Sequence, residues 1–430
     1  MLGSSSDGSR RRPVLVAGLA LWLAAGVALN AANVVDSLRR WGLLDLQVYR
    51  MGGGALLAGA PLYELRYAHD DLLFTYTPFA AALFVPLHLL GWTGGALAVT
   101  VASVAALGRV AVLLGRAAAG QRGAPLGPPW FLPVLLFAGG LSMWPTRSTL
   151  ELGQINLVVL WLVVEDVLGA GRSARGGRWA GCLTGLAVGV KLTPAFLLPW
   201  HLATGERARA GRLAATAAAT VAVGFVMQPG QAWSYWTRWL WDPARVGDPG
   251  YAGNQSLAGL LQRAAGGPPP PPVLLAGVLL VGGAAVAVGT VAVRRGRRLD
   301  GLAAVVTGML LVSPISWSHH WVAMLVVVAA LLAPPAGEPR PLVVARTALA
   351  AGLAVLLQVR VMFLVPAGSA AGGVLASAYV LAGLGGLILL AVATSWPARN
   401  QTVAPVAARC PGGTAVARGA PDPVAPAVDR

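Results

Sequence analysis

Long apolar runs, separated by short polar or basic segments, follow one another along most of this chain. They fall near residues 14–35, 77–92, 94–115, 129–145, 152–170, 179–200, 210–228, 271–293, 300–316, 320–335, 341–363 and 372–396. Each approaches the roughly 20 residues that a helix needs to cross a bilayer core. Only 11% of the residues are charged, whereas soluble domains average about 25%. The sequence therefore predicts an all-α polytopic membrane protein with about twelve transmembrane helices.

The segments between these runs predict a single membrane domain with a basic start and a disordered end. Residues 1–13 form a basic N-terminal segment, residues 14–396 the transmembrane domain, and residues 397–430 a tail of Ala, Pro, Gly and Arg without periodicity. Arginines cluster at Arg10–Arg12, Arg207–Arg212 and Arg294–Arg298. Because basic loops tend to stay in the cytoplasm, an even number of spans places both termini there. The longer loops, about 36–76 and 229–270, then lie outside the cell.

Two other basic loops disagree with this arrangement. The same count places Arg116–Arg122 and Arg172–Arg178 outside the cell, against the preference of basic loops for the cytoplasm. Either two of the runs are re-entrant or these loops are exceptions, so the topology of the middle spans stays open.

Composition and cysteine usage exclude several classes of function. The formal charge of +16 comes from arginines between apolar runs, which is typical of contact with anionic lipid rather than nucleic acid. Cys182 and Cys410 are the only cysteines and provide no disulfide framework. Neither a phosphate-binding glycine loop nor His and Cys at zinc-ligand spacing is present. We therefore expect no metal and no soluble nucleotide cofactor.

The first external loop carries the leading catalytic candidate. Asp45 follows the first apolar run and shares a helix face with Tyr49. An ionised aspartate can accept a proton, and the glycines at Gly52–Gly54 would let a bulky substrate approach the backbone. Tyr63 and Tyr76 follow in the same loop. The alternative is that Asp45 simply caps an interfacial helix.

Polar groups interrupt two of the central apolar runs. Lys191 is the only lysine of the chain and lies within an apolar run, where a charge is costly unless it faces a polar cavity. It could neutralise a phosphate, or it could extend to the membrane interface. Before it, a polar stretch carries candidates for lining a substrate site or for holding helices together: Arg147, Glu151, Gln154 and Asn156.

Two aromatic-rich segments complete the candidate set. Residues 233–241 contain four tryptophans and one tyrosine, which indicates a membrane-interface belt or a platform for sugar rings. Asn254 and Gln255 end this loop as hydroxyl-binding amides or as helix caps. Near residue 320 the candidates are Trp317, His319 and His320, which could bind a phosphate or a hydroxyl, or form an interfacial cluster.

The motifs, taken in order, resemble glycosyltransferase family 87. They are D-x-x-x-Y from Asp45, G-x-P-L-Y from Gly59, Y-x-P from Tyr76, GQxN from Gly153, KxTP from Lys191, GNQS from Gly253 and SPxSWxHH from Ser313. The similarity runs from about residue 14 to about residue 395. The family consists of polytopic C-type glycosyltransferases that use polyprenyl-phosphate mannose.

The resemblance implies an active site in a cavity on the periplasmic side of the plasma membrane, a lipid-linked sugar donor, a glycolipid acceptor and no metal. It assigns the role of catalytic base to Asp45, and the role of the functional histidine to His319 or His320. Lys191 and Arg147 are further candidates for binding the donor phosphate. Two alternatives remain: an arabinofuranose donor within the same fold, or a lipid or sugar transporter without chemistry.

Overall fold

The computed structural model describes residues 7–40, 42–67, 72–123, 125–169, 177–242, 245–364 and 370–396. Within these ranges the chain is almost entirely helical, and strands are limited to the antiparallel pair β1 (Arg66–Tyr67) and β2 (Leu72–Leu73). The expected all-α architecture is confirmed. The expected disordered tail, 397–430, and the first six residues of the basic N-terminal segment lie outside the described residues.

Five helices are long and apolar enough to cross a membrane. They are α1 (Asp7–Arg40, from Ala17), α4 (Gly91–Arg122), α10 (Arg207–Met227), α13 (Pro271–Arg294) and α18 (Ala378–Ser395). Together with the apolar composition, they make this a membrane protein.

The other predicted spans are occupied by shorter helices. These are α3 (Pro78–Leu89), α5 (Phe131–Ser142), α7 (Asn156–Leu168), α14 (Arg298–Val312), α15 (Met324–Leu331) and α16 (Arg340–Leu356). The run at 179–200 is divided into α8 (Cys182–Val190), η1 (Thr193–Phe196) and α9 (Leu197–Ala203). Because these pieces are shorter than a bilayer crossing, the count of twelve spans stays a prediction.

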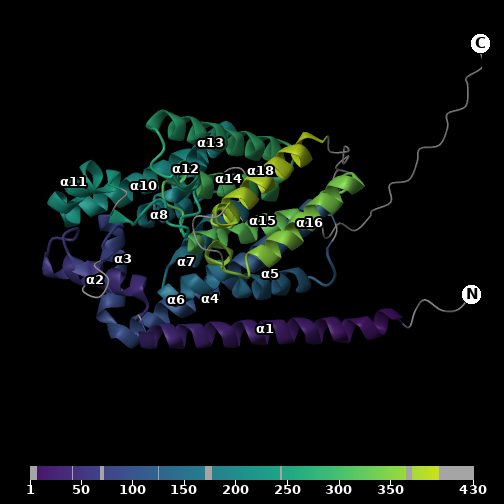
Figure 1. The fold of residues 1–430 in the computed structure, drawn as a ribbon, viewed down its shortest axis with the longest axis horizontal. Helices are drawn as coiled ribbons and strands as arrows, with labels where there is room; N and C mark the ends of the chain where they lie inside the picture. Colours follow the sequence, from purple (N-terminus) through teal and green to yellow (C-terminus); the bar gives the residue numbers. More distant parts are fainter. Residues whose placement is uncertain are drawn as a thin grey trace, which may run out of the picture.

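The loop helices gather at one end of the molecule. α2 (Leu44–Ala58), α3 and α11 (Pro229–Thr237) lie together at the end opposite the start of α1, which runs along one side of the bundle (Figure 1). A backbone N–H of Leu62 donates to Gln231 at 3.1 Å and so joins the two predicted external loops. The remaining short helices are α6 (Trp144–Leu152), η2 (Trp239–Trp241), α12 (Leu257–Ala265), η4 (Ser318–Ala323), η5 (Val361–Phe363) and α17 (Ala370–Leu375).

Small residues allow α13 and α14 to pack closely. A Cβ added to Gly289 of α13 would lie 3.0 Å from the Gly301 carbonyl of α14, and one added to Gly301 would lie 2.9 Å from the Gly289 carbonyl. Such reciprocal close approach is typical of helix packing in membranes, where dispersion contacts replace the hydrophobic drive. The pair supports the wall of the bundle that carries the functional cavity.

Part of the arginine excess is neutralised inside the protein. Glu206 pairs with Arg298 at 2.8 Å and with Arg209 at 3.4 Å, and Asp300 pairs with Arg346 at 2.8 Å. The predicted cytoplasmic clusters therefore hold helix ends together as well as presenting charge to the membrane surface.

Candidate active site

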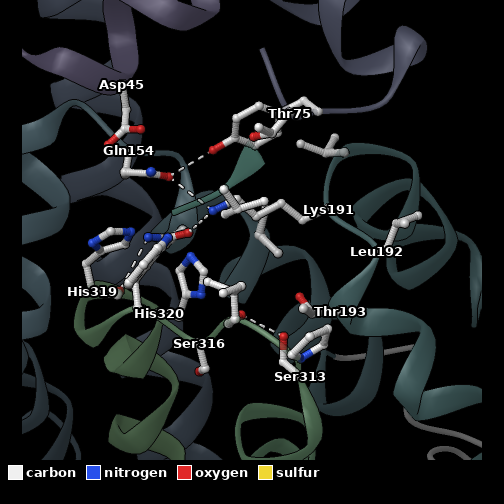
Figure 2. A pocket seen from close by; sticks show the side chains of 18 of the residues that line it. Asp45, Thr75, Gln154, Lys191, Leu192, Thr193, Ser313, Ser316, His319 and His320 are labelled. Atoms are coloured by element: carbon white, nitrogen blue, oxygen red, sulfur yellow. Dashed lines mark hydrogen bonds between the residues drawn. The ribbon is translucent and has the colours of Figure 1, made fainter. Parts of the chain in front are cut away.

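A cavity of about 660 Å³ opens among α2, the segment before α3, the break after α8 and the segment before η4. It has the size of a small-molecule binding site. Nine of the candidates from the sequence line it: Asp45, Tyr63, Tyr76, Gln154, Asn156, Lys191, Trp317, His319 and His320. Segments more than 250 residues apart in the sequence thus meet at one place (Figure 2).

The start of α2 positions Asp45. Leu43 has a left-handed backbone, with φ 49°, and turns the chain after Gly42 so that α2 begins at Leu44. Asp45 then lies in the first turn, where the helix dipole favours a carboxylate. Leu43 is the cap residue, so Asp45 is not the helix cap that the alternative interpretation required.

The glycines after Asp45 serve helix packing. A Cβ at Gly53 would lie 2.7 Å from the Phe84 carbonyl of α3, and a Cβ at Gly52 would overlap the Phe74 ring. The expectation that Gly52–Gly54 open space for a substrate is therefore wrong. The Phe74 ring and residues of α3 fill that space. The glycines instead let α2 lie directly on α3.

Gln154 connects the polar groups of the cavity. Its Oε1 atom accepts hydrogen bonds from the Tyr49 hydroxyl at 2.7 Å, the Tyr76 hydroxyl at 3.3 Å and Lys191 Nζ at 3.1 Å. Three donors on one oxygen fix the orientation of the amide, so that its NH₂ group faces Asp45, beside it in Figure 2. The amide is thereby held as a hydrogen-bond donor to the carboxylate.

The backbone before Gln154 brings it to α2. Gly153 caps α6 with φ 70°, and a Cβ there would lie 2.8 Å from the Leu46 Cβ and 3.2 Å from the Leu43 Cβ. Only glycine combines this left-handed conformation with so close an approach. The loop after α6 therefore reaches the start of α2.

Asp45 has an altered proton affinity. Removal from bulk water raises the pKa of Asp45 to about 6, while the Gln154 amide and the Lys191 charge act in the opposite direction. A carboxylate with this pKa is ionised at neutral pH and is a stronger base than an ordinary aspartate.

Lys191 reaches the cavity because α8 ends one residue earlier. The lysine is extended, with φ −134° and ψ 128°, and its Nζ atom donates to Asn156 Oδ1 at 2.5 Å as well as to Gln154. The same atom lies 5.5 Å from the centre of the Tyr76 ring. The side chain thus faces the polar groups of the cavity, as one of the two interpretations of the sequence required.

The two histidines lie at the start of η4. Their ring centres are 4.8 Å apart, and both rings line the cavity. The His319 carbonyl accepts hydrogen bonds from Thr149 at 3.2 Å and from Asn156 at 3.3 Å, which fixes the backbone here. His319 Nε2 is buried and has no hydrogen-bond partner in the described part of the chain. This nitrogen is available to a ligand.

Five candidates lie outside the cavity lining: Tyr49, Arg147, Glu151, Asn254 and Gln255. Tyr49 is fully buried behind Gln154. The Arg147 guanidinium donates to the Gln358 carbonyl at 2.5 Å. Arg147 and Glu151 are both described, and they form no ion pair with each other.

Asn254 and Gln255 are buried connectors. Asn254 accepts from the Ser316 N–H at 2.8 Å, and Gln255 donates to the Ala376 carbonyl at 2.6 Å. These two amides hold the loop at 229–270 against the segment that carries Trp317.

Sequence reasoning offered the aromatic segment as a possible sugar platform but selected none of its residues for the site. Tyr235, Trp239, Asp242 and Arg245 line the cavity together with the predicted residues. The density of aromatic residues at 233–241 was the available signal, but nothing in the pattern selects Arg245. No group of three or more His, Cys, Asp or Glu side chains with metal-binding geometry occurs among the described residues.

Comparison with known proteins identifies the family. The family model of glycosyltransferase family 87 matches residues 74–314, which include Gln154 and Lys191. The chain belongs to glycosyltransferase family 87. The resemblance inferred from the motifs is confirmed, and this family 87 member is an enzyme of the glycosyltransferase class. Asp45, His319 and His320 lie outside the matched range.

Relatives match this glycosyltransferase over most of its length. A polyprenol-phosphate-mannose-dependent α-(1-2)-phosphatidylinositol mannoside mannosyltransferase of Mycobacterium tuberculosis is 34% identical over 324 residues, which are 71% of this chain and 74% of the relative. A polyprenol-phosphate-mannose-dependent α-(1-2)-phosphatidylinositol pentamannoside mannosyltransferase of Mycolicibacterium smegmatis is 35% identical over 300 residues, 68% of each chain. No solved structure matches.

Proposed function

We propose that this chain transfers mannose from polyprenyl-phosphate mannose to a hydroxyl group of a glycolipid, with α-1,2 linkage. The observation that carries the proposal is the placement of Asp45 in the cavity, beside the Gln154 amide and near the Lys191 charge. The names of the mycobacterial relatives support the donor and the acceptor.

The reaction is a direct displacement at the anomeric carbon. Asp45 takes the proton of the acceptor hydroxyl while that oxygen forms a bond to the anomeric carbon, and the bond from this carbon to the phosphate oxygen breaks. The carbon passes through an oxocarbenium-like state, and the electron pair leaves with polyprenyl phosphate. A single displacement inverts the configuration of the sugar.

The phosphate that leaves requires positive or hydrogen-bonding partners. Lys191 lines the same cavity as the base and supplies a positive charge. The unpartnered Nε2 of His319, with His320 beside it, supplies hydrogen bonding. Stabilisation of developing charge by groups already in place is a large contribution to catalysis.

For the chain we propose the C-type glycosyltransferase fold, with twelve spans in a single domain over residues 14–396. The cavity faces the periplasm and both termini lie in the cytoplasm. The gathering of α2, α3 and α11 at the end opposite the start of α1 supports this orientation (Figure 1). The lipid-linked donor serves as co-substrate, and the chemistry assigned to Asp45 and Lys191 calls for neither a metal nor a cofactor.

The experiment is mannose transfer in membranes that contain Asp45→Asn at normal expression. Loss of the base should reduce the rate by roughly 10²–10⁴-fold. Asp248→Asn is the matched control, because this exposed aspartate of the external loop does not line the cavity. Near-normal transfer by Asp45→Asn would contradict the assignment.

The donor is tested separately. Labelled polyprenyl-phosphate mannose and polyprenyl-phosphate arabinofuranose, each with a panel of glycolipid acceptors, distinguish the two sugars. We expect transfer from the mannose donor alone, and linkage analysis of the product should give the α-1,2 bond. The membership in a glycosyltransferase family decides against a transporter without chemistry.

A further inference from the structure

A second positive group lines the cavity, on the aromatic loop. Arg245 is partly buried, and its guanidinium carbon lies 4.2 Å from the centre of the Trp239 ring. One N–H group donates to the Tyr63 carbonyl at 2.5 Å. These contacts hold the guanidinium in place and leave its other N–H groups for a ligand.

The surroundings of Arg245 are positive. Arg66 of β1 and Arg238 lie close enough to repel it, while Asp242 attracts it. The Arg238 guanidinium lies 4.1 Å from the centre of the same Trp239 ring. Arg238, on the same tryptophan ring, thus adds positive charge beside Arg245, which favours an anionic ligand.

This positive group is separate from the reacting centre. Lys191 donates to Gln154, whereas Arg245 donates to the Tyr63 carbonyl. The Tyr63 hydroxyl donates to the Tyr76 carbonyl and the Tyr76 hydroxyl to Gln154, so two tyrosine side chains lie between the Arg245 contact and Gln154. Among the described residues no hydrogen bond joins Arg245 to Gln154 or Lys191. In the donor the phosphate is bonded directly to the anomeric carbon that reacts, so its place is near Asp45 and Lys191. The phosphate that Arg245 suits is therefore a different one.

The position of the loop relative to the bilayer indicates which phosphate this is. Trp233 and Trp241 precede Arg245 on the same loop and are 65% and 74% exposed. Exposed tryptophans of this kind lie at the level of lipid headgroups. A glycerophospholipid holds its phosphodiester at the same level.

We propose that Arg245, fixed by Trp239 and Tyr63, binds the phosphodiester of the acceptor lipid while the sugar of that lipid reaches Asp45. The proposal rests on the mannosyltransferase function proposed above and adds the residue that recognises the acceptor: Arg245 would bind the phosphodiester that the phosphatidylinositol mannosides named for the relatives carry. The arginine selects the acceptor and takes no part in the chemical step. A planar guanidinium suits this purpose, because it can make two parallel hydrogen bonds to phosphate oxygens.

The test compares two acceptors with the full-length enzyme in detergent. One is a phosphatidylinositol mannoside and the other is a neutral mannosyl diacylglycerol with the same acyl chains. Arg245→Gln should raise KM for the anionic acceptor by about tenfold or more, the usual effect of losing a hydrogen bond to a charged group. The KM for the neutral acceptor and the KM for the donor should not change.

Arg238→Gln is the matched control. This variant also removes one positive charge that lies on the Trp239 ring, but Arg238 does not line the cavity. Because Arg238 adds charge near Arg245 but no ligand to the cavity, this variant should raise the KM for the anionic acceptor much less than Arg245→Gln does, and it should leave the KM for the neutral acceptor unchanged. If Arg245→Gln does not accumulate in membranes, Arg245→Lys replaces it, with a smaller rise in KM for the anionic acceptor alone.

The outcomes separate this inference from the function on which it rests. Equal changes for both acceptors, no change for either, a rise in donor KM, or the same effect in Arg238→Gln would overturn the role of Arg245. A wild-type enzyme that uses only the anionic acceptor would support it, since the phosphodiester and its inositol are what the neutral lipid lacks. Failure of the wild type to transfer mannose to either acceptor would overturn the proposed function itself.

Discussion

At the residue scale, the orientation of one amide favours the ionised form of the proposed base, against the effect of burial. Gln154 Oε1 is occupied by Tyr49, Tyr76 and Lys191, so only its NH₂ group remains for Asp45. The sequence placed Gln154 among substrate-lining candidates. The structure makes it a positioning residue that acts through Asp45, a role that no pattern of nearby residues could reveal because its partners lie far apart in the chain.

The pH dependence of the reaction follows from the burial of Asp45 and from its contact with Gln154. Asp45 must be ionised to accept a proton, and its pKa is raised to about 6 by burial. The kcat/KM should therefore fall by about tenfold per pH unit below the pKa of Asp45. Gln154→Met removes a donor that favours the carboxylate, so the pKa of Asp45 should rise and the acid limb should move to higher pH.

A pH–rate profile of mannose transfer checks this prediction. Gln262→Met is the control, because Gln262 lies on α12 and contacts Asp248, and it does not line the cavity. A Gln154→Met profile with the wild-type acid limb and only a lower plateau would mean that Gln154 has a purely structural role.

At the element scale, the positions of the helices were more predictable than their lengths. The apolar runs near 94–115, 210–228 and 271–293 correspond to α4, α10 and α13. The run at 179–200 instead breaks at Lys191, because the lysine bonds to Asn156 and Gln154 across the cavity. Hydropathy records the apolar average of such a run, whereas the break depends on contacts with another helix.

A glycine at the end of α6 offers a test at this scale. Gly153→Ala should lower mannose transfer by at least about tenfold, because a Cβ at φ 70° collides with Leu46 and displaces Gln154 from Asp45. Gly59→Ala, at φ 63° after α2, is the matched control, since nothing lies within 4 Å of its added Cβ.

Both variants carry the same backbone penalty of about 1–2 kcal/mol for a left-handed alanine. A difference in transfer between them, at equal amounts in the membrane, isolates the collision with α2. Equal losses would mean that backbone strain alone explains the effect of Gly153→Ala.

At the scale of the whole molecule, the sequence predicted that the first loop and the aromatic loop share a side of the membrane. The structure agrees that they lie together: Leu62 bonds to Gln231, and Arg245 bonds to Tyr63. The resemblance implied a cavity, but its full lining was not predictable, because it depends on how α7, α14 and η4 pack around these loops. Polar density alone selected Arg147 and Glu151, which lie outside the cavity lining.

We predict that the cavity opens to the periplasm, and single cysteines can test this. With Cys182 and Cys410 replaced by serine, Trp241→Cys should react in intact cells with a maleimide that cannot cross the membrane, since this position is 74% exposed on the aromatic loop. Arg295→Cys, exposed in a predicted cytoplasmic cluster, should react only after permeabilisation. The reverse pattern would place the cavity and Asp45 in the cytoplasm, where a periplasmic acceptor could not reach them.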